Sequence, residues 1–247
     1  MKIIYHLGRY SGLMFKVFAK PEKGRIFFQR VLSEIENLGL NSVGIVFIIS
    51  IFMGAVLTIQ TGINLENPFI PLYLIGYGTR DSMILEFSCT IVSLILAGKV
   101  GSNIASEIGT MRVTEQIDAL EIMGVNSANH LILPKIIAAV FINPFLVIMS
   151  IFVGIWGGWL GGCVLTDVLT TDAYIVGLRF YFNPFYITYS LIKTVVFAFI
   201  ITSVSSYMGY YTDGGALEVG RSSTQAVVYS SVLILMFNLI LTQLLLA

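Results

Sequence analysis

The chain has 247 residues, of which 56% are hydrophobic and only 11% are charged, and its formal net charge is zero. A soluble domain carries about 25% charged residues, so the surplus apolar surface indicates a protein that faces lipid. The balanced charge, with no basic tail, argues against nucleic acid as a partner.

Cysteine and histidine provide little material for catalysis. Cys89 and Cys163 lie far apart in apolar runs, which predicts buried thiols rather than a disulfide framework or a metal site. His6 and His130 stand alone, so neither a catalytic triad nor a zinc site is expected. The sequence therefore predicts no catalytic residue, no bound metal and no cofactor.

Residues 1–40 are predicted to form amphipathic helices at the membrane interface. Apolar residues recur at steps of three and four, at Ile3, Leu7, Tyr10, Met14 and Val17. Arg9, Lys16 and Lys20 fall on another side of the same helix, a pattern that suits the headgroup region. Pro21 is expected to end this helix, and a second amphipathic stretch then leads toward the bilayer.

Residues 41–247 are predicted to form a single transmembrane domain with five membrane-spanning helices. Each apolar run is long enough to cross a hydrocarbon core of ~30 Å as a helix. The expected spans are about 43–62, 82–103, 135–165, 184–210 and 224–247. The expected fold class is therefore an all-α integral membrane protein with an N-terminal interfacial amphipathic helix.

The distribution of basic residues predicts the orientation. The N-terminal region holds seven Lys and Arg, the segment from Lys99 to Lys135 holds three, and the loop before the last span holds Arg221. The opposite side of the membrane would hold only Arg80 and Arg179. The positive-inside rule then places the N-terminus in the cytoplasm and the C-terminus outside.

The third span contains GIWGGWLGG, in which Gly154 and Gly158, and likewise Gly157 and Gly161, are four residues apart. Glycines at this spacing let two membrane helices approach backbone to backbone. The partner helix could belong to the same chain or to a second subunit, and the spacing leaves both possibilities open.

Glu86 and Lys193 are the two ionisable residues that lie deepest in the predicted spans. Counting the helical rise from the cytoplasmic ends places both at the same depth. A charge facing lipid at the bilayer centre costs about 2.5 to 3.5 kcal/mol, so each should face protein or water. They could form an ion pair between the second and fourth spans, or contact a substrate in a cavity that opens outward.

The stretch of about 107–124 is predicted to be an acidic amphipathic helix in the cytoplasm, between the second and third spans. One stripe of it contains Val113, Ile117, Leu120 and either Met123 or Gly124. The charged residues sum to minus three, and they are Glu107, Arg112, Glu115, Asp118 and Glu121. A helix that rests on an anionic leaflet would be basic, so the acidic sign favours a protein groove. A solvated connection between the two spans is the alternative.

Three stretches resemble the MlaE permeases, the membrane subunits of ABC systems that move phospholipids and work with MCE-domain proteins. They are EIGTMRVTEQIDALEIMGVN, the overlapping LILAGKVGSNIASEIG, and EVGRSSTQAVVYSS. With the amphipathic N-terminus and five spans, the resemblance covers nearly the whole chain. It implies a homodimeric permease in the bacterial inner membrane, with a periplasmic C-terminus. Its expected role is to move phospholipids between that membrane and the outer envelope and so support outer-membrane lipid asymmetry.

The resemblance also implies partners. A cytoplasmic ABC ATPase would hold the stretch 107–124 as a coupling helix, and a periplasmic MCE-domain protein would lie outside. The chain has no GxxxxGK[ST] motif, so ATP hydrolysis is expected on a separate chain and this one is not expected to be an enzyme.

The resemblance further implies that Glu86 and Lys193 match an acidic and a basic position near an outward-facing lipid cavity. Family members commonly have Arg directly before that Glu, whereas this chain has Leu85. Arg80 lies upstream and could substitute for the missing arginine. These four residues are the expected substrate contacts.

Other functions remain as alternatives. The same resemblance fits another hydrophobic cargo, such as a sterol or a fatty acid. An ion-coupled secondary transporter could use Glu86 and Lys193, but five spans without an evident inverted repeat argue against it. An intramembrane enzyme could use Glu86, but no paired His, Ser or metal-ligand cluster accompanies it.

Overall fold

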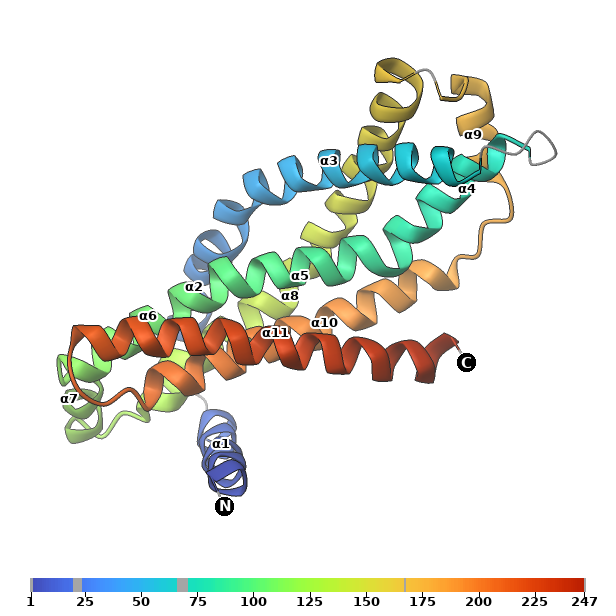
Figure 1. Ribbon diagram of the computed structural model, residues 1–247. Helices are drawn as coiled ribbons and strands as arrows, with labels where there is room; N and C mark the ends of the chain where they lie inside the picture. The colour runs from blue at the N-terminus through green and yellow to red at the C-terminus, as the bar shows by residue number, and fades with distance from the viewer. Residues whose placement is uncertain (1, 20–23, 66–70, 167, 247) are drawn as a thin grey trace. The chain divides into compact units, whose positions relative to one another are not determined.

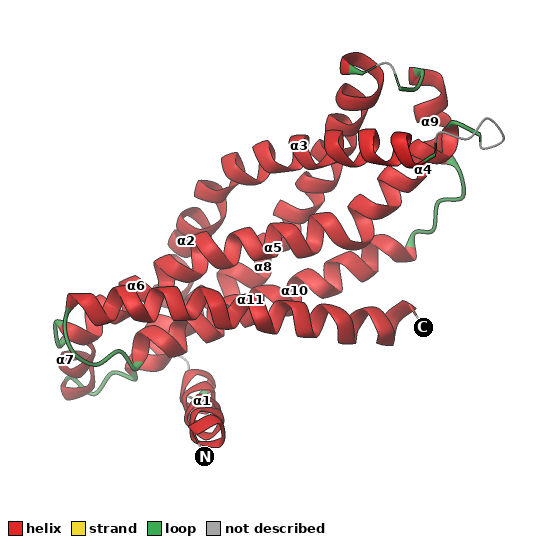
Figure 2. Cartoon of the chain, viewed as in Figure 1, coloured by secondary structure: helices red, strands yellow, loops and turns green. Residues whose placement is uncertain are grey.

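The computed structural model describes residues 2–19, 24–65, 71–166 and 168–246, and these form helices joined by short loops, with no strand among them (Figures 1 and 2). The chain divides into two compact units. Unit 1 contains Met1–Asn41, Ser93–Asn143 and Val195–Ala247. Unit 2 contains Ser42–Val92 and Pro144–Thr194.

The helices include several π-helical segments, labelled η, in which the backbone turn is wider than in an α-helix. In chain order they are α1 (Lys2–Phe18), α2 (Gly24–Glu34), η1 (Ile35–Leu40), α3 (Asn41–Asn64), α4 (Tyr73–Ser82), η2 (Met83–Ile91), α5 (Val92–Leu96), η3 (Ala97–Gly101), α6 (Ser102–Val113), α7 (Gln116–Ile122), α8 (Ser127–Trp159), η4 (Leu160–Leu165), α9 (Thr171–Arg179), α10 (Phe185–Tyr210) and α11 (Ala216–Leu246).

Five continuous helices in the described part of the chain are long and apolar enough to cross a membrane. They cover Phe27–Asn64, Tyr73–Val113, Ser127–Leu165, Phe185–Tyr210 and Ala216–Leu246. The all-α membrane fold with five spans is therefore confirmed. Four of the helices begin before the residues expected from hydropathy, because a helical backbone continues beyond the apolar residues that cross the hydrocarbon core. The predicted helix end at Pro21 lies outside the described residues.

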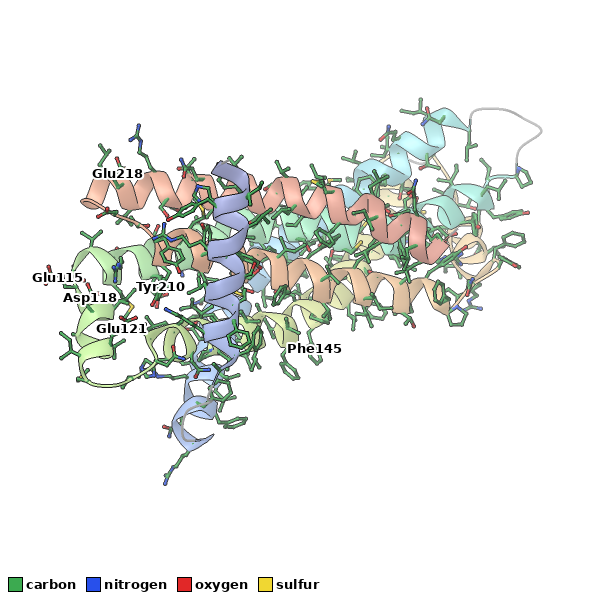
Figure 3. All side chains as sticks on the ribbon, turned by 90° about the horizontal axis from the view of Figure 1, so that it is seen from below. Glu115, Asp118, Glu121, Phe145, Tyr210 and Glu218 are labelled. Atoms are coloured by element: carbon green, nitrogen blue, oxygen red, sulfur yellow. The ribbon has the colours of Figure 1, made fainter. Side chains whose placement is uncertain are left out.

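In unit 1, the amphipathic helix α1 is anchored on α10. Leu13 and Val17 are fully buried, and the Tyr10 hydroxyl donates a hydrogen bond to Ser203 Oγ over 2.9 Å. Figure 3 shows α1 running across the direction of α10 and α11. Elsewhere in the unit, α11 lies along α6 (Figure 1). A helix that crosses two membrane-spanning helices in this way is placed to lie in the plane of the membrane surface.

In unit 2, the glycines of α8 and η4 face α3 of the same chain. A Cβ added to Gly157 would lie 2.7 Å from Ile51 Cα, and one added to Gly161 would lie 2.7 Å from Ala55 Cα. A Cβ on Gly54 of α3 would collide with the carbonyl oxygen of Gly154. Because a side chain at these positions would strike backbone, the glycine spacing serves a close contact between two helices within one chain.

Gly158 belongs to the same contact, since a Cβ there would lie 2.6 Å from both Thr58 Oγ1 and the Tyr174 hydroxyl oxygen. Tyr174, on the short helix α9, is 1% exposed and donates a hydrogen bond to the carbonyl of Ile155 over 2.8 Å. Burial raises the pKa of this phenol above its usual value. The α9 helix therefore closes one end of unit 2 through a protonated, buried tyrosine.

Candidate functional site

The first candidate site is the ion pair inside unit 2. Lys193 Nζ on α10 lies 2.7 Å from Glu86 Oε1 on η2. The lysine is fully buried, whereas the glutamate side chain keeps 39% of its surface exposed. Burial of an unpaired ammonium group would be costly, and the carboxylate removes most of that cost. The ion pair expected as one alternative is thus present, and a carboxylate edge stays accessible beside it.

Hydroxyl groups hold the Glu86 carboxylate in place. Thr90 Oγ1 donates to Glu86 Oε2 over 3.1 Å, and the Tyr189 hydroxyl donates to Oε1 over 3.4 Å. The Tyr189 ring also contacts the lysine, with Lys193 Nζ 4.4 Å from the ring centroid. Charge-assisted hydrogen bonds of this kind fix orientation as well as charge. The arrangement can present one oriented acidic group to a polar ligand.

Arg80 and Leu85, the other two expected substrate contacts, differ from this pair. Arg80 is 3% exposed, and its guanidinium pairs with Asp81 over 2.7 Å. It also donates to the backbone carbonyls of Leu178 and Phe180 over 2.7 and 2.8 Å. These bonds occupy donors that a phosphate would need, which argues against Arg80 as a replacement for the missing arginine. Leu85 is half-buried beside Glu86 and has no charge to offer.

The second candidate site is the coupling segment, residues 107–124, in unit 1. The sequence predicted one helix there, but the structure has two, α6 and α7, separated at Thr114 and Glu115. Glu115 has φ of 60°, in the left-handed region that residues other than glycine seldom adopt. Such strain persists only where the surroundings enforce it, and it occurs often at functional sites.

Most charges of the coupling segment have partners within the chain. Arg112 Nη1 lies 2.5 Å from Asp118 Oδ1. Glu121 Oε1 accepts hydrogen bonds from Ser127 Oγ over 2.9 Å and from the Tyr210 hydroxyl over 3.0 Å. Figure 3 shows Glu121 near Tyr210. Glu121 therefore ties α7 to the start of α8 and the end of α10, rather than standing free.

The break at Glu115 changes which side chains face outward. Ile117 is fully buried within the chain, so it is not available to a partner, contrary to the stripe expected from a single helix. Val113 and Leu120 are half-buried. Met123, an expected member of that stripe, is 68% exposed, and Ile122, which the sequence did not single out, is 87% exposed. Ile122 lies off the stripe of a single continuous helix, so only knowledge of the break at Glu115 would have pointed to it.

Glu115 is an exposed charge of this segment that differs from the others in its surroundings. Among the described residues its carboxylate has no ion pair or hydrogen bond. Figure 3 shows it at the outer end of the segment. The free surface of the coupling segment therefore combines one unpaired carboxylate with two exposed apolar side chains.

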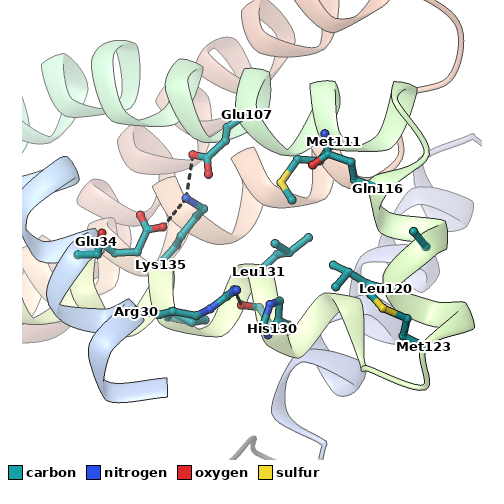
Figure 4. A pocket seen from close by; sticks show the side chains of 13 residues that line it. Arg30, Glu34, Glu107, Met111, Gln116, Leu120, Met123, His130, Leu131 and Lys135 are labelled. Carbon is teal, nitrogen blue, oxygen red and sulfur yellow. Dashed lines mark hydrogen bonds and ion pairs between the residues drawn. The ribbon is translucent and has the colours of Figure 1, made fainter. Parts of the chain in front are cut away.

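A pocket of about 520 Å³ opens between α2, the coupling segment and the start of α8 (Figure 4). Lys135 lies in its wall, is 2% exposed, and contacts Glu34 Oε1 over 2.7 Å and Glu107 Oε2 over 2.9 Å. Arg30 Nη1 donates to the carbonyl of His130 over 3.1 Å in the same wall. Lys135 thus joins α2 to the coupling segment.

Nearly the whole chain is similar to known membrane permeases. Residues 31–244 match the family described as Permease MlaE. A probable ABC transporter permease of Rickettsia bellii is 34% identical over 244 residues, which cover 99% of this chain and 93% of the relative. The intermembrane phospholipid transport system permease MlaE of Haemophilus influenzae is 30% identical, over 96% of this chain and 90% of the relative.

A plant relative is similar over a smaller part of its own length. The chloroplastic protein TRIGALACTOSYLDIACYLGLYCEROL 1 of Arabidopsis thaliana is 34% identical over 226 residues, which cover 89% of this chain and 62% of the relative.

Proposed function

The chain belongs to the MlaE permease family of ABC transporters, and we propose that it moves phospholipids between the inner membrane and the outer envelope, in support of outer-membrane lipid asymmetry. The observation that carries this proposal is the match along 96% of the chain to a relative named as a phospholipid transport permease. Five apolar spans and an oriented Glu86–Lys193 pair within them are consistent with a cargo that has both acyl chains and a polar headgroup.

The proposed mechanism uses movement rather than a catalytic side chain. A cavity admits the lipid, and closure driven by ATP hydrolysis on a separate ATPase chain releases it. The coupling segment would transmit that closure, since its exposed surface has the character of a docking site. The apolar side chains of Ile122 and Met123 would enter a pocket of the ATPase, and Glu115 would meet a basic residue at its rim.

The proposed assembly is a homodimer, with the N-terminus in the cytoplasm and the C-terminus in the periplasm, where an MCE-domain protein would receive the lipid. The orientation rests on the excess of basic residues in the N-terminal region and around the coupling segment. The accessible edge of Glu86 would contact the cargo headgroup. A sterol or fatty acid is the alternative cargo, and the same geometry would accommodate it with fewer polar contacts.

Co-purification tests the coupling proposal. The full-length chain, isolated from its native membrane in mild detergent, should retain an ATPase subunit that mass spectrometry identifies. The double variant Glu115→Asn/Ile122→Ser should lower the retained ATPase about tenfold, because it removes the free charge and an exposed apolar contact. Asn tolerates the left-handed backbone, so the fold at residue 115 is preserved. The matched control is Leu165→Ser, a side chain 75% exposed outside the coupling segment.

Transport into acceptor vesicles completes the test. The wild-type complex should move fluorescent phospholipid only when ATP is present, and faster than it moves a fluorescent sterol. Nucleotide-independent transport by the chain alone would contradict the proposed mechanism. Full ATPase retention by Glu115→Asn/Ile122→Ser would contradict the proposed docking surface. Faster transport of the sterol than of the phospholipid would identify a sterol as the cargo.

A further inference from the structure

A second polar pocket lies in unit 1, where α1 meets the turn between α10 and α11. Its volume is about 430 Å³, and none of its lining residues belongs to the coupling segment or to the Glu86–Lys193 pair. Sites for small ligands commonly have volumes of about 300 to 1,000 Å³. The charged residues of the lining include both signs, and they are Arg9, Arg221, Asp213 and Glu218. A pocket of this size and charge pattern fits a small zwitterionic group.

The cationic wall formed by α1 is held in place before any ligand arrives. The Arg9 guanidinium carbon lies 3.7 Å from the centroid of the Tyr211 ring, within the range of a cation–π contact. One turn earlier, His6 Nδ1 and the Tyr207 hydroxyl oxygen are 2.8 Å apart. Both contacts join α1 to the end of α10. Because Arg9 is oriented in advance, binding an anion there would cost little ordering entropy.

The opposite wall is formed by the turn and the first residues of α11. Gly214 has φ of 116°, a conformation that favours glycine, and it directs the chain into α11. Asp213, just before it, is exposed and has no ion pair among the described residues. Arg221 Nη1 lies 2.9 Å from Glu218 Oε1, and both side chains are well exposed. This wall therefore offers a free carboxylate beside a guanidinium that keeps several donors unused.

The pocket lies beside a helix whose outer surface is suited to lipid. The side chains of α1 that are more than half exposed include Ile4, Tyr5, Leu7, Phe15 and Phe18. An exposed apolar face on a helix that crosses two membrane-spanning helices places α1 at the boundary between headgroups and acyl chains. The pocket therefore opens at the depth of phospholipid headgroups.

We propose that this pocket binds a phospholipid headgroup that carries a phosphate and a primary ammonium, the phosphoethanolamine class. Arg9 and Arg221 would bind the phosphate, since guanidinium groups match its oxygens in charge and geometry. Asp213 and Glu218 would accept hydrogen bonds from the ammonium. The bound lipid would belong to the surrounding membrane, and its binding does not depend on which cargo the protein transports.

The charge pattern separates this headgroup from the other common ones. A quaternary ammonium is recognised by open aromatic faces, but Arg9 already covers the Tyr211 ring, and the Tyr207 ring packs against Tyr10 and Tyr211. An anionic headgroup without an ammonium would bring its negative charge close to Asp213 and Glu218 and leave Asp213 without a partner. Phosphoethanolamine is the headgroup that pairs both signs of the lining.

Native mass spectrometry of the full-length chain in detergent tests the proposal. The probes are phosphatidylethanolamine, phosphatidylcholine and phosphatidylglycerol with the same short acyl chains, and inorganic phosphate. Phosphatidylethanolamine should bind about tenfold more tightly than the other two lipids, because it alone satisfies both charges. Measurement in the Glu86→Gln/Lys193→Met background, which removes both charges of the pair in unit 2, separates this site from a cargo site, and the preference should persist there.

Variants locate the binding. The double variant Arg9→Gln/Arg221→Gln should weaken phosphatidylethanolamine binding about tenfold. Lys16→Gln, which removes a charge from α1 outside the pocket, should leave binding unchanged. Asp213→Asn changes an exposed turn residue, so it tests the site without risk to the fold. It should weaken phosphatidylethanolamine binding and strengthen phosphatidylglycerol binding.

Four outcomes would overturn the assignment. Equal affinity of the wild type for all three lipids would remove the headgroup preference. Unchanged binding by both pocket variants would place the lipid elsewhere. Competition by inorganic phosphate at the same concentration would assign a free phosphate site. Loss of a co-purified protein from Arg9→Gln/Arg221→Gln, with lipid binding intact, would make the pocket a protein interface.

Discussion

Lys193 and Lys135 are both buried, but their surroundings differ. Lys193, in unit 2, faces one carboxylate, Glu86, within an apolar span. Lys135, in unit 1, faces two, Glu34 and Glu107, beside a polar pocket. The first cluster is electrically neutral, which the low dielectric of the membrane interior favours. The second cluster carries an excess negative charge that nearby water can screen.

The contacts that stabilise unit 1 internally differ in kind from those within unit 2. Unit 2 relies on close backbone contact between α3 and α8, together with buried polar contacts such as that between Ser50 and Ser150. Unit 1 relies on hydrogen bonds and ion pairs that join several elements, including the Glu121 and Lys135 contacts. A closely packed unit tolerates little adjustment, while a network of polar bonds offers several discrete rearrangements. We therefore expect conformational change within unit 1 rather than within unit 2.

Breaking the Lys193 pair should have the largest effect. Lys193→Met leaves the Glu86 carboxylate without its counter-ion and should lower the free energy of unfolding by about 3 kcal/mol. Thermal unfolding of the purified protein in detergent measures this loss.

The double variant Glu86→Gln/Lys193→Met removes both charges and should recover most of the stability. Its phospholipid transport should stay low, because the accessible carboxylate edge is gone. Recovery of both stability and transport would reduce the pair to a structural contact.

The close packing of unit 2 is tested at Gly54. Gly54→Ala places a methyl group against the backbone of Gly154 and should cost about 1 to 3 kcal/mol in unfolding free energy. Gly44, on the same helix, has no atom within 4 Å of an added Cβ. Gly44→Ala should therefore be neutral or stabilising by up to about 1 kcal/mol. Equal unfolding temperatures for the two variants would argue against the close α3–α8 contact.

The charged cluster of unit 1 should be less sensitive. Lys135→Met leaves two like charges together, but Glu107 is 47% exposed and water screens the repulsion. The expected cost is about 1 to 2 kcal/mol in unfolding free energy. ATPase activity of the complex should fall markedly even though the loss of stability is modest, because α2 and α6 lose their common contact.

Glu34→Gln is the matched control for Lys135→Met. It keeps the Lys135–Glu107 pair and makes the cluster neutral, so it should cost less than Lys135→Met in both measurements. A loss of stability from Lys135→Met as large as that from Lys193→Met would remove the distinction between the two clusters.

The smallest effect concerns Tyr174. Tyr174→Phe removes one buried hydrogen bond and should cost about 1 kcal/mol at neutral pH. Burial raises the pKa of this phenol above that of the unfolded chain. Its contribution is therefore complete below about pH 10, the unfolded value, and is lost as the pH rises above it. The stability of Tyr174→Phe should fall less steeply above pH 10 than that of the wild type.

Much of the fold could be predicted from local properties of the sequence. Apolar runs of sufficient length identified the five spans, because crossing lipid requires a continuous helix. The helical rise also placed Glu86 and Lys193 at one depth. Their pairing could not be derived in the same way, because it depends on how two helices far apart in the chain are rotated about their axes.

Arg80 and the coupling segment show features that the sequence could not predict. The partners of Arg80 are carbonyl groups about one hundred residues away, and sequence spacing does not indicate them. The left-handed backbone of Glu115 has no signal in residue type, since glutamate seldom adopts it. With the helix broken there, Ile117 is buried within the chain, contrary to expectation, and Ile122 is exposed.

The sequence by itself determined the class of the protein, its spans and the segments that resemble a family, because hydropathy and motifs are local along the chain. Only the tertiary structure decided which charges are paired, which glycines meet backbone and which apolar side chains remain outside. Those properties depend on contacts between distant segments, and the free energy of a buried charge or a close helix contact is set by the partner it meets.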